Sequence, residues 1–364
     1  MLSIYKHSHF LPNAFGHGGD KRTAQIEHLL AAAGMVVNKA ELNYMIATGS
    51  KLSFYLSGLL HHTTLHTGNK SKYAIGRYKA IFEQFVKQYK PDLFIWESTI
   101  AYHLLLAEVL HKYNVPVVAL PHNLESLVEG SASVFSGKLS PNWLFEEMDY
   151  LKYCTKVFTI SREENWLLAN YGINSAYLPY YPSPEAASFL LNIRREKESR
   201  MNSIKQGHQN ILLLGTFHNP PTVAGFLQLL QHLKTIRGIK INIAGFGSEK
   251  FGDQFSGDNI SVMGSVTNET LAKLIINSDC AIIHQQPSGG ALTRIPELLL
   301  AGLPVIANTH AARSCEKTPG LHVYDSYQEL TRILSGRNYV SPAVIEKPAE
   351  EQAFINYIKT LVGS

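Results

Sequence analysis

The chain has few cysteines, no strong excess of charge and no long apolar run. Its three cysteines, Cys154, Cys280 and Cys315, lie far apart in a sequence of 364 residues. They form neither a zinc-binding pair nor a disulfide framework, which favours a reducing compartment. The 33 basic and 29 acidic residues leave a net charge of +4, too small and too dispersed to indicate a nucleic-acid partner.

Membrane-spanning and secretory patterns are also missing. Apolar runs such as 211–214 and 298–301 are far shorter than the roughly 20 residues that cross a bilayer. The opening segment, MLSIYKHSHFLPN, lacks the apolar stretch of a signal peptide. We therefore expect a cytoplasmic protein that is soluble, or at most peripheral at the inner face of the membrane.

What the sequence does contain is a repeated alternation of short apolar runs and helical patterns. This alternation predicts an α/β fold with parallel sheets covered by helices, and the length suits about two domains. Strands are expected at 93–96, 115–120, 156–160, 211–214, 240–244, 260–263, 280–284 and 304–307. Helices between them are expected at 101–113, 140–154, 222–235, 269–277 and 292–301.

A change of composition marks a domain boundary. Prolines gather at 179–184, and a strongly polar stretch follows at 194–200. We expect an N-terminal domain over 1–182, a second domain over 183–345, and a C-terminal helix over 346–364 that packs back on the N-terminal domain. A surface helix inside a single domain would give the same composition. In doubly wound sheets of this kind, ligands bind beyond the carboxyl ends of the strands.

Two glycine-rich loops are candidates for anion binding. The segment 16–19, Gly-His-Gly-Gly, precedes an expected helix, whose N-terminus favours an anion together with nearby backbone N–H groups. An ordinary glycine turn has the same composition, and the GK[ST] of a P-loop is missing. The segment 245–247 follows a strand, but Lys250 stands where a dinucleotide-binding loop has its third glycine. A nicotinamide site is therefore not expected.

The strongest motif is the stretch PSGGALTRIPELLLAGLPVIAN. Ser288, Gly289 and Gly290 offer backbone amides just ahead of an expected helix, which suits a diphosphate. Arg294, one turn into that helix, is expected to pair with phosphate. Glu297 lies on the same helix face, where its carboxylate can accept hydrogen bonds from a ribose diol. A surface ion pair between Arg294 and Glu297 is the alternative.

The histidines and one basic helix give weaker signals. His122 ends a strand in LPHN, where a structural role and a functional role both fit a lone histidine. His61, His62 and His66 have no carboxylate or thiol nearby in the sequence, so no metal site is expected. The segment 70–90 predicts an amphipathic helix with a basic face. That pattern suits contact with an anionic membrane surface and equally an ordinary core-facing helix.

Taken in order, these motifs resemble those of GT-B glycosyltransferases, specifically glycosyltransferase family four. The resemblance extends from about residue 10 to residue 335. Besides the glycine loop it rests on the segments PVVALPHNLE, KVFTISREE, YLPYYPS, LLLGTFHNPPTV, INIAGFGSE, NISVMGSV and SGGALTRIPELLLAGLPVIA. It implies the GT-B fold, in which two Rossmann-like doubly wound domains face each other across a cleft.

The resemblance also implies an activity. A sugar would be transferred from a nucleotide-diphosphate sugar to a glycan or lipid-linked acceptor, as in polysaccharide biosynthesis, with retention and with neither metal nor cofactor. His122 and Glu297 would serve in catalysis, His122 beside the donor sugar and Glu297 on the donor ribose. The other donor-binding residues would be Gly18, Gly19, Gly215, His218, Gly245, Ser288, Gly289, Gly290 and Arg294.

Two departures from the family pattern leave other functions open. Gly289 stands where the family often has the first of two glutamates. The segment 216–219 carries no cation, whereas many members have Arg and Lys there. A catalytically silent GT-B protein that binds nucleotide or glycan fits these departures. A GT-B epimerase or phosphorylase is a further alternative.

Overall fold

The computed structural model describes residues 2–61, 68–200, 207–217, 220–255, 257, 259–315 and 317–363. Contacts between residues divide the chain into two compact units. The first unit comprises Met1–Pro12, Ile26–Pro179 and Pro348–Ser364, and the second comprises Asn13–Gln25 and Tyr180–Lys347. None of the helices in the described ranges is both long enough and apolar enough to cross a membrane.

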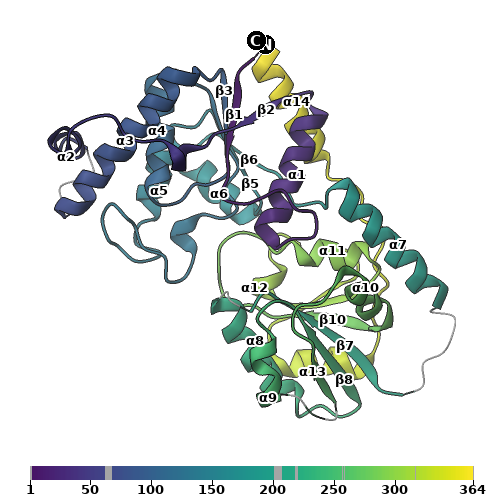
Figure 1. The fold of residues 1–364 in the computed structure, drawn as a ribbon. Coiled ribbons are helices and arrows are strands. Elements are labelled where there is room, and N and C mark those ends of the chain that lie inside the picture. The colour runs from purple at the N-terminus through teal and green to yellow at the C-terminus, as the bar shows by residue number, and fades with distance from the viewer. Residues whose placement is uncertain are drawn as a thin grey trace. The chain divides into compact units, whose positions relative to one another are not determined.

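The first unit is built on a six-stranded parallel sheet in the order β2-β1-β3-β4-β5-β6 (Figure 1). The strands are β1 (Ile4–His7), β2 (Val37–Lys39), β3 (Leu93–Trp96), β4 (Val117–Ala119), β5 (Lys156–Thr159) and β6 (Ser175–Tyr177). The central strands β3 and β4 are continuous apolar runs, buried along their whole length, as is typical of parallel strands covered on both faces.

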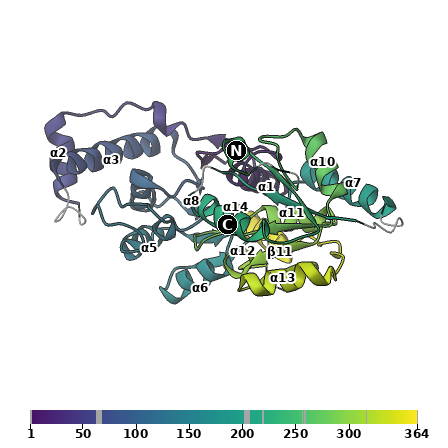
Figure 2. The ribbon, with the colours of Figure 1, turned by 90° about the horizontal axis from the view of Figure 1, so that it is seen from below.

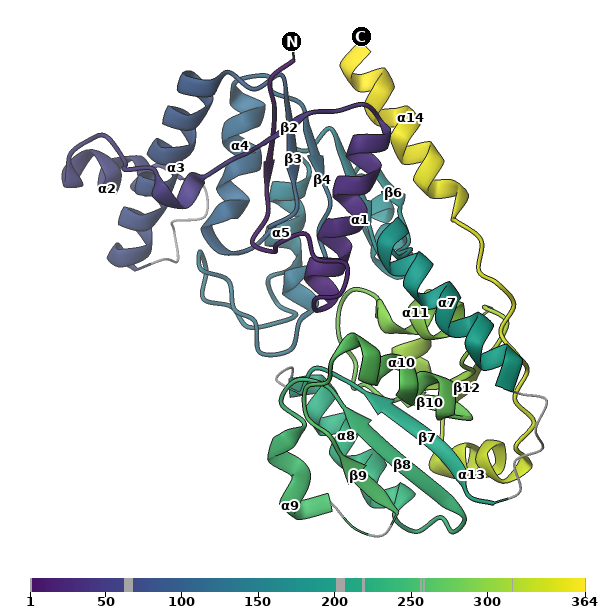
Figure 3. The ribbon, with the colours of Figure 1, turned by 45° about the vertical axis from the view of Figure 1, so that its right-hand side comes forward.

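Helices cover both faces of this sheet, because successive side chains of a strand point to opposite faces. Phe94 and Trp96 pack in a cluster with α3, α4 and α5, whereas Leu93 and Ile95 pack with α1 and α14. Figure 3 shows α14 beside α1. The helices are α1 (Gly18–Ala32), η1 (Leu42–Tyr44), α2 (Lys51–Leu59), α3 (Asn69–Tyr89), η3 (Ala101–Leu104), α4 (Leu105–Lys112), η4 (Glu125–Leu127), α5 (Leu144–Leu151), α6 (Arg162–Asn170) and α14 (Ala349–Gly363).

Helix α2 packs against α3, away from the sheet (Figures 1 and 2). The two helices touch through glycines. A Cβ atom on Gly58 would lie 1.8 Å from the carbonyl oxygen of Lys72, and one on Gly76 would lie 1.8 Å from that of Phe54. Only glycine permits this close approach of two backbones.

The second unit repeats the architecture with its own six-stranded parallel sheet, in the order β12-β11-β10-β7-β8-β9. The strands are β7 (Gln209–Leu214), β8 (Ile239–Ala244), β9 (Ile260–Val262), β10 (Cys280–Ile283), β11 (Val305–Asn308) and β12 (Leu321–Tyr324). Leu212 packs on one face with α7, α10 and α11, and Ile211 and Leu213 pack on the other with α8, α9 and α13.

The helices of this unit are α7 (Pro184–Arg200), α8 (Pro220–Leu233), η5 (Glu249–Phe251), α9 (Gly252–Phe255), α10 (Asn268–Asn277), α11 (Arg294–Leu300), α12 (Thr309–Ala312) and α13 (Tyr327–Gly336). The segment 13–25, which the sequence analysis assigned to the N-terminal domain, makes its contacts here. One of these contacts is that of the Lys21 ammonium group with Glu297.

The structure confirms the expected α/β class with two doubly wound parallel sheets. Every predicted strand is present, with ends shifted by at most two residues. The strands β1, β2, β6 and β12 were not predicted. The predicted helix at 101–113 is a 3₁₀ turn, η3, followed by the shorter α4. Ser161 caps α6, since its Oγ accepts a hydrogen bond from the Glu164 N–H at 3.3 Å.

Candidate functional site

Each sheet has one place where the order of its strands reverses. In the first unit the chain leaves β1 for β2 on one side and later returns to β3 on the other. In the second unit the corresponding neighbours are β7 and β10. The connections beyond such a pair of strands run in opposite directions and leave a crevice, where ligands of doubly wound proteins bind. The side chains beyond β1 and β3, and beyond β7 and β10, therefore border the two places where a ligand is expected.

Arg294 bridges the second of these places. Its Nη1 donates a hydrogen bond of 2.6 Å to the carbonyl oxygen of Leu214, the last residue of β7. A Cβ atom on Gly215 would lie 3.2 Å from that same nitrogen, so glycine there leaves room for the guanidinium. Burial lowers the pKa of Arg294, and the nearby Glu297 carboxylate opposes this shift.

Gly245 directly follows the neighbouring strand β8, and its conformation and surroundings require glycine. Its φ of 132° lies in the region that favours glycine. A Cβ atom there would lie 1.8 Å from the carbonyl oxygen of Gly215. The two predicted donor-binding glycines, Gly215 and Gly245, thus touch each other beyond the carboxyl ends of β7 and β8.

Glu297 lies at the centre of a three-residue cluster. Lys21 Nζ is 2.6 Å from its Oε2, and the Tyr180 hydroxyl donates a hydrogen bond of 2.8 Å to its Oε1. The Glu297 residue is 8% exposed. Burial, followed by the charge of Glu297 and the hydrogen bond to it, raises the pKa of Tyr180, which keeps the hydroxyl a donor. The predicted surface pair between Arg294 and Glu297 is not the main contact of this carboxylate.

Lys21 and Tyr180 were not predicted as site residues. They come from segments remote in sequence from Glu297, and only the fold brings them together. The available signals were local ones: Lys21 follows the glycine loop in the first turn of α1, and Tyr180 lies in the segment YLPYYPS.

The first turn of α1 also lies near the start of α11. Gly18 and Gly19 are the first two residues of α1. A Cβ atom on Gly18 would lie 3.4 Å from the Thr293 Oγ1. The structure therefore brings the predicted residues Gly18, Gly215, Gly245, Arg294 and Glu297 into one unit, at or near the switch between β7 and β10.

The loop at 288–290 differs from the prediction in one respect. Helix α11 begins at Arg294, so the glycines do not adjoin its N-terminus and Arg294 is its first residue, not one turn inside. Pro296 explains the late start, since proline fits the first turn of a helix, where its missing N–H has no intrahelical partner to lose. The backbone N–H groups of the loop are therefore not part of the N-terminus of α11.

Side chains hold that loop in place. Arg313 donates through Nε to the carbonyl oxygen of Gly290 at 2.9 Å and through Nη2 to that of Gly289 at 2.5 Å. Gln285 Nε2 donates to the Ser288 Oγ at 2.5 Å. Gly290 has a φ of 69°, which favours glycine. These hydrogen bonds to carbonyl oxygens and to Ser288 fix the backbone conformation of the loop.

The structure describes only some of the histidines considered in the sequence analysis. His218, His62 and His66 lie outside the described residues. His61 is described, and its Nε2 lies 2.9 Å from a carboxylate oxygen of Glu108. A carboxylate therefore does lie near His61 in the structure. The sequence did not indicate it, because Glu108 belongs to α4 and is remote in sequence.

His122 belongs to the first unit, beyond the end of β4. Its Nε2 lies 3.3 Å from Glu97 Oε2, and its ring stacks on Phe10 with a centroid distance of 4.6 Å. Glu97 follows β3 and has a fully buried side chain, whose other oxygen lies 3.1 Å from Lys6 Nζ. The orientation of the imidazole is thus set by a carboxylate and an aromatic ring.

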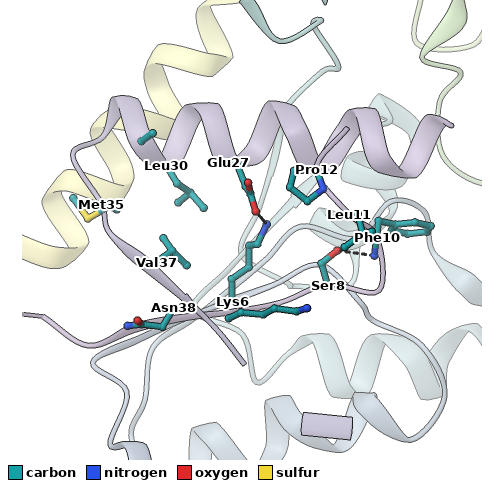
Figure 4. A pocket seen from close by; sticks show the side chains of 12 residues that line it. Lys6, Ser8, Phe10, Leu11, Pro12, Glu27, Leu30, Met35, Val37 and Asn38 are labelled. Atoms are coloured by element: carbon teal, nitrogen blue, oxygen red, sulfur yellow. Dashed lines mark hydrogen bonds and ion pairs between the residues drawn. The ribbon is translucent and has the colours of Figure 1, made fainter. Parts of the chain in front are cut away.

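The first unit contains a cavity of about 290 Å³ between β1, β2 and α1 (Figure 4). Lys6, Lys39 and Asn38 contribute polar groups from the strands, and Glu27 contributes a carboxylate from α1. Lys6 Nζ donates a hydrogen bond of 2.6 Å to that carboxylate. The sequence analysis did not find this cavity, because the two strands that line it were not predicted.

Helix α3 corresponds to the basic segment at 70–90. Ile75, Phe82 and Phe85 of its apolar stripe are buried in the core of the first unit. The stripe is therefore the core-facing side that an ordinary helix would have. On the neighbouring helix α2, by contrast, Leu52 and Leu56 are 67% and 48% exposed.

No family model matches the sequence, and no curated protein matches it. Solved structures do match over essentially the whole chain. A sucrose-phosphate synthase from Thermosynechococcus elongatus is 13% identical, with a TM-score of 0.61, and the match covers 100% of this chain and 98% of that one. The chain has the GT-B fold.

Two further matches of this fold come from other enzymes. A trehalose 6-phosphate synthase from Burkholderia multivorans is 12% identical, with a TM-score of 0.57, and the match covers 100% of this chain and 94% of that one. The catalytic domain of starch synthase IV from Arabidopsis thaliana, bound to ADP and acarbose, is 11% identical, with a TM-score of 0.60 and coverage of 99% and 94%. At these identities the likeness is one of fold.

Proposed function

We propose that the chain is a glycosyltransferase that moves a sugar from a nucleotide-diphosphate sugar to a glycan or lipid-linked acceptor, with retention. The observation that carries the proposal is the cluster of Glu297 with Lys21 and Tyr180, in the unit that also holds Arg294. The GT-B fold supports it, as do matched proteins described as UDP-forming or as bound to ADP.

The donor diphosphate is assigned to the second unit. A leaving diphosphate needs positive charge and hydrogen-bond donors, and these can be supplied without a metal ion. Lys21 and Arg294 provide the charge, and the glycines at 215, 245, 289 and 290 let backbone groups approach closely. Lys21 thereby supplies a cation that the segment after β7 lacks.

Glu297 is assigned to the ribose of the donor. Each carboxylate oxygen can accept two hydrogen bonds, so the contacts with Lys21 and Tyr180 leave room for a diol. The two contacts also fix the rotamer of the carboxylate before the donor arrives, which lowers the entropic cost of binding. In this proposal Glu297 orients the donor, and the Lys21 ammonium group contacts both the Glu297 carboxylate and the donor phosphate.

The acceptor is assigned to the first unit. Its cavity of about 290 Å³ offers lysine, asparagine and carboxylate groups, which suit the hydroxyls of a sugar. His122, held by Glu97 and Phe10, is the group proposed to lie beside the sugar during transfer. No step through a metal ion is required by this assignment.

A lipid-linked acceptor would place the protein at a membrane surface. With the apolar stripe of α3 buried, we assign membrane contact to α2 and the residue after it, together with the basic side of α3. Leu52, Leu56, Leu59 and Leu60 of this segment are 67%, 48%, 44% and 86% exposed. Exposed leucines beside lysines are the combination that interfacial helices use on anionic membranes.

The decisive experiment is a thermal-shift and hydrolysis screen against UDP-, GDP-, ADP- and TDP-sugars. A donor present at 100 times its Kd stabilises the folded state by about 2.7 kcal/mol, which raises the melting temperature. The Glu297→Ala variant should lose this shift. Glu269→Ala, which removes an exposed carboxylate of the same unit, is the matched control. No binding and no hydrolysis across the panel would refute the proposal.

Gly289 favours a second candidate function. Because the family's first glutamate is absent at this position, the chain can bind a donor without transferring its sugar. A catalytically silent binding protein would give the same thermal shift and the same loss in Glu297→Ala. It would show no turnover in a broad acceptor screen, and this readout separates the two functions.

A further inference from the structure

Three histidines converge beyond the switch point of the first sheet. His7 is the last residue of β1, His9 follows it, and His103 lies in η3, which comes after β3. One ring nitrogen of each lies within 4.8 Å of those of the other two. The His7 and His103 rings stack at a centroid distance of 4.7 Å, and His9 meets both rings edge-on.

The backbone holds these rings together. The His9 N–H donates a hydrogen bond of 2.6 Å to the Ser98 Oγ, which joins the segment after β1 to the segment after β3. The Glu97 N–H donates to the carbonyl oxygen of His7 at 3.0 Å. Ala101, at the start of η3, has a φ of 49°, an uncommon conformation for alanine. The positions of the histidines are thus fixed by the hydrogen-bonded backbone of the segments that follow β1 and β3.

Two nitrogens of the cluster are unsatisfied. His7 is 3% exposed and His103 is 7% exposed. Among the residues that the structure describes, His7 Nδ1 and His103 Nε2 have no hydrogen-bond partner. Buried polar atoms are nearly always paired, so two orphan nitrogens in one cluster call for a ligand.

We propose that His7, His9 and His103 form a binding site for a divalent transition-metal ion of the zinc class. The proposal concerns the first unit alone and does not depend on the proposed transferase activity. It replaces the expectation of no metal site, which considered only histidines that are close in sequence.

The protonation state of the rings suits this role. His7 and His103 are 3% and 7% exposed, and burial disfavours the charged form of an imidazole. Neutral imidazole is the form that binds metal ions.

The ligand set selects the ion. Three imidazole nitrogens suit zinc, cobalt, nickel or copper, whereas magnesium and calcium require oxygen ligands. Zinc takes histidine nitrogens at about 2.0–2.1 Å, so a tetrahedral site brings them to about 3.4 Å from one another. His9 is exposed and its side chain has room for that adjustment. Three protein ligands leave a fourth position for water or a substrate oxygen.

Charge around the cluster favours a cation over an anion. The side chain of Glu97 is fully buried, and its backbone N–H donates to the carbonyl oxygen of His7. Lys6, a nearby ammonium group, lies 3.1 Å from Glu97. An anion at three neutral rings beside a fully buried carboxylate would have no charged partner within the cluster.

The test uses the untagged full-length chain, stripped with a chelator and titrated with Zn²⁺ by calorimetry. We expect about one ion per chain, a rise in melting temperature with Zn²⁺ and none with Mg²⁺. Co²⁺ should give the visible absorption of a nitrogen-ligated site. Absence of Zn²⁺ binding would overturn the proposal and leave the cluster as a stack of neutral core rings.

Two variants locate the site. His9→Ala removes the exposed ring of the three, and it should weaken Zn²⁺ binding by at least about 10-fold, since even the loss of an outer partner of a metal ligand has that effect. His111→Ala removes another exposed histidine of the same unit and should leave binding unchanged. Equal affinity of the wild type and His9→Ala would refute the assignment.

Discussion

The pair of Lys21 and Glu297 gives the sharpest test of the second unit. We expect the two side chains to be strongly coupled in a double-mutant cycle of Lys21→Met and Glu297→Gln. The ammonium nitrogen and the carboxylate oxygen are 2.6 Å apart, and the side chains are only 20% and 11% exposed. The contact holds the first turn of α1 to α11 within this unit. Breaking it should therefore lower the free energy of unfolding.

The magnitude follows from distance and burial. At 2.6 Å and an effective dielectric constant of about 20, the Coulomb attraction is roughly 6 kcal/mol, and desolvation offsets most of it. Contacting residues in such cycles couple by about 0.5–3 kcal/mol, and largely exposed pairs fall at the low end of that range. We expect about 2 kcal/mol for this largely buried pair.

The chain contains its own control. Lys273 and Glu269 are separated by nearly the same distance, 2.7 Å, but their side chains are 68% and 79% exposed. The corresponding cycle should give a coupling within experimental error. The distance between the charges is nearly constant, so the two pairs differ in burial and in their separation along the chain.

The assay must report on the second unit. Trp96, Trp143 and Trp166 all lie in the first unit, so tryptophan fluorescence follows that unit. Far-UV circular dichroism in urea follows both units and provides the free energies for the cycle. A coupling between Lys21 and Glu297 no larger than that of the exposed pair would refute the reasoning.

Two further predictions concern the first unit. Full burial raises the pKa of Glu147 to about 7 from 4.5, although Ser126 and two backbone N–H groups oppose the shift. The folded state then binds the proton more tightly than the unfolded state. Between pH 4.5 and 7 this group therefore lowers the free energy of unfolding by up to about 1.4 kcal/mol per pH unit as the pH rises. Urea unfolding across that range should show this slope in the difference in unfolding free energy between the wild type and Glu147→Gln, and equal pH dependence of the two proteins would contradict the prediction. The double variant Leu56→Ser, Leu60→Ser should co-sediment with anionic liposomes at least about 10-fold less than the wild type at low salt. The control is Leu139→Ser, which also removes an exposed leucine, and unchanged co-sedimentation of the double variant would exclude α2 as the contact.

The strands show which parts of the fold can be predicted from sequence. The central strands were found because burial on both faces makes them continuous apolar runs, such as Leu93–Trp96. The edge strands β2, β6 and β12 were missed, whereas the edge strand β9 was predicted. Edge strands are only partly covered, and β6 has no fully buried residue, so its pattern does not differ from that of a loop. Strand β1 is central but was still missed, because Lys6 and His7 interrupt its apolar pattern. Lys6 and His7 are nevertheless buried, because they make polar and ring contacts near the carboxyl end of the strand.

The site shows the same division. Glu297 and Arg294 could be proposed from the sequence because they lie close together in one motif. Their partners Lys21 and Tyr180 could not, since contacts across such separations in sequence leave no local periodicity. The histidine cluster was missed for this reason, because His103 joins His7 only through the pairing of β1 with β3. Chain order places loops at a sheet edge, but only the packed structure shows which side chains meet there.

The two switch points have opposite electrostatic character, although their sheets share one topology. Beyond β7 and β10 lie the cations Lys21 and Arg294, with glycines that expose the backbone. Beyond β1 and β3 lie neutral imidazoles and the buried carboxylate of Glu97, whose nearest ammonium, Lys6, is already paired with it. In the proposed function, the cations of the second unit would stabilise a nucleotide diphosphate. The proposed metal ion would instead use the imidazoles of the first unit, so the two proposals place ligands of opposite charge at the two switch points.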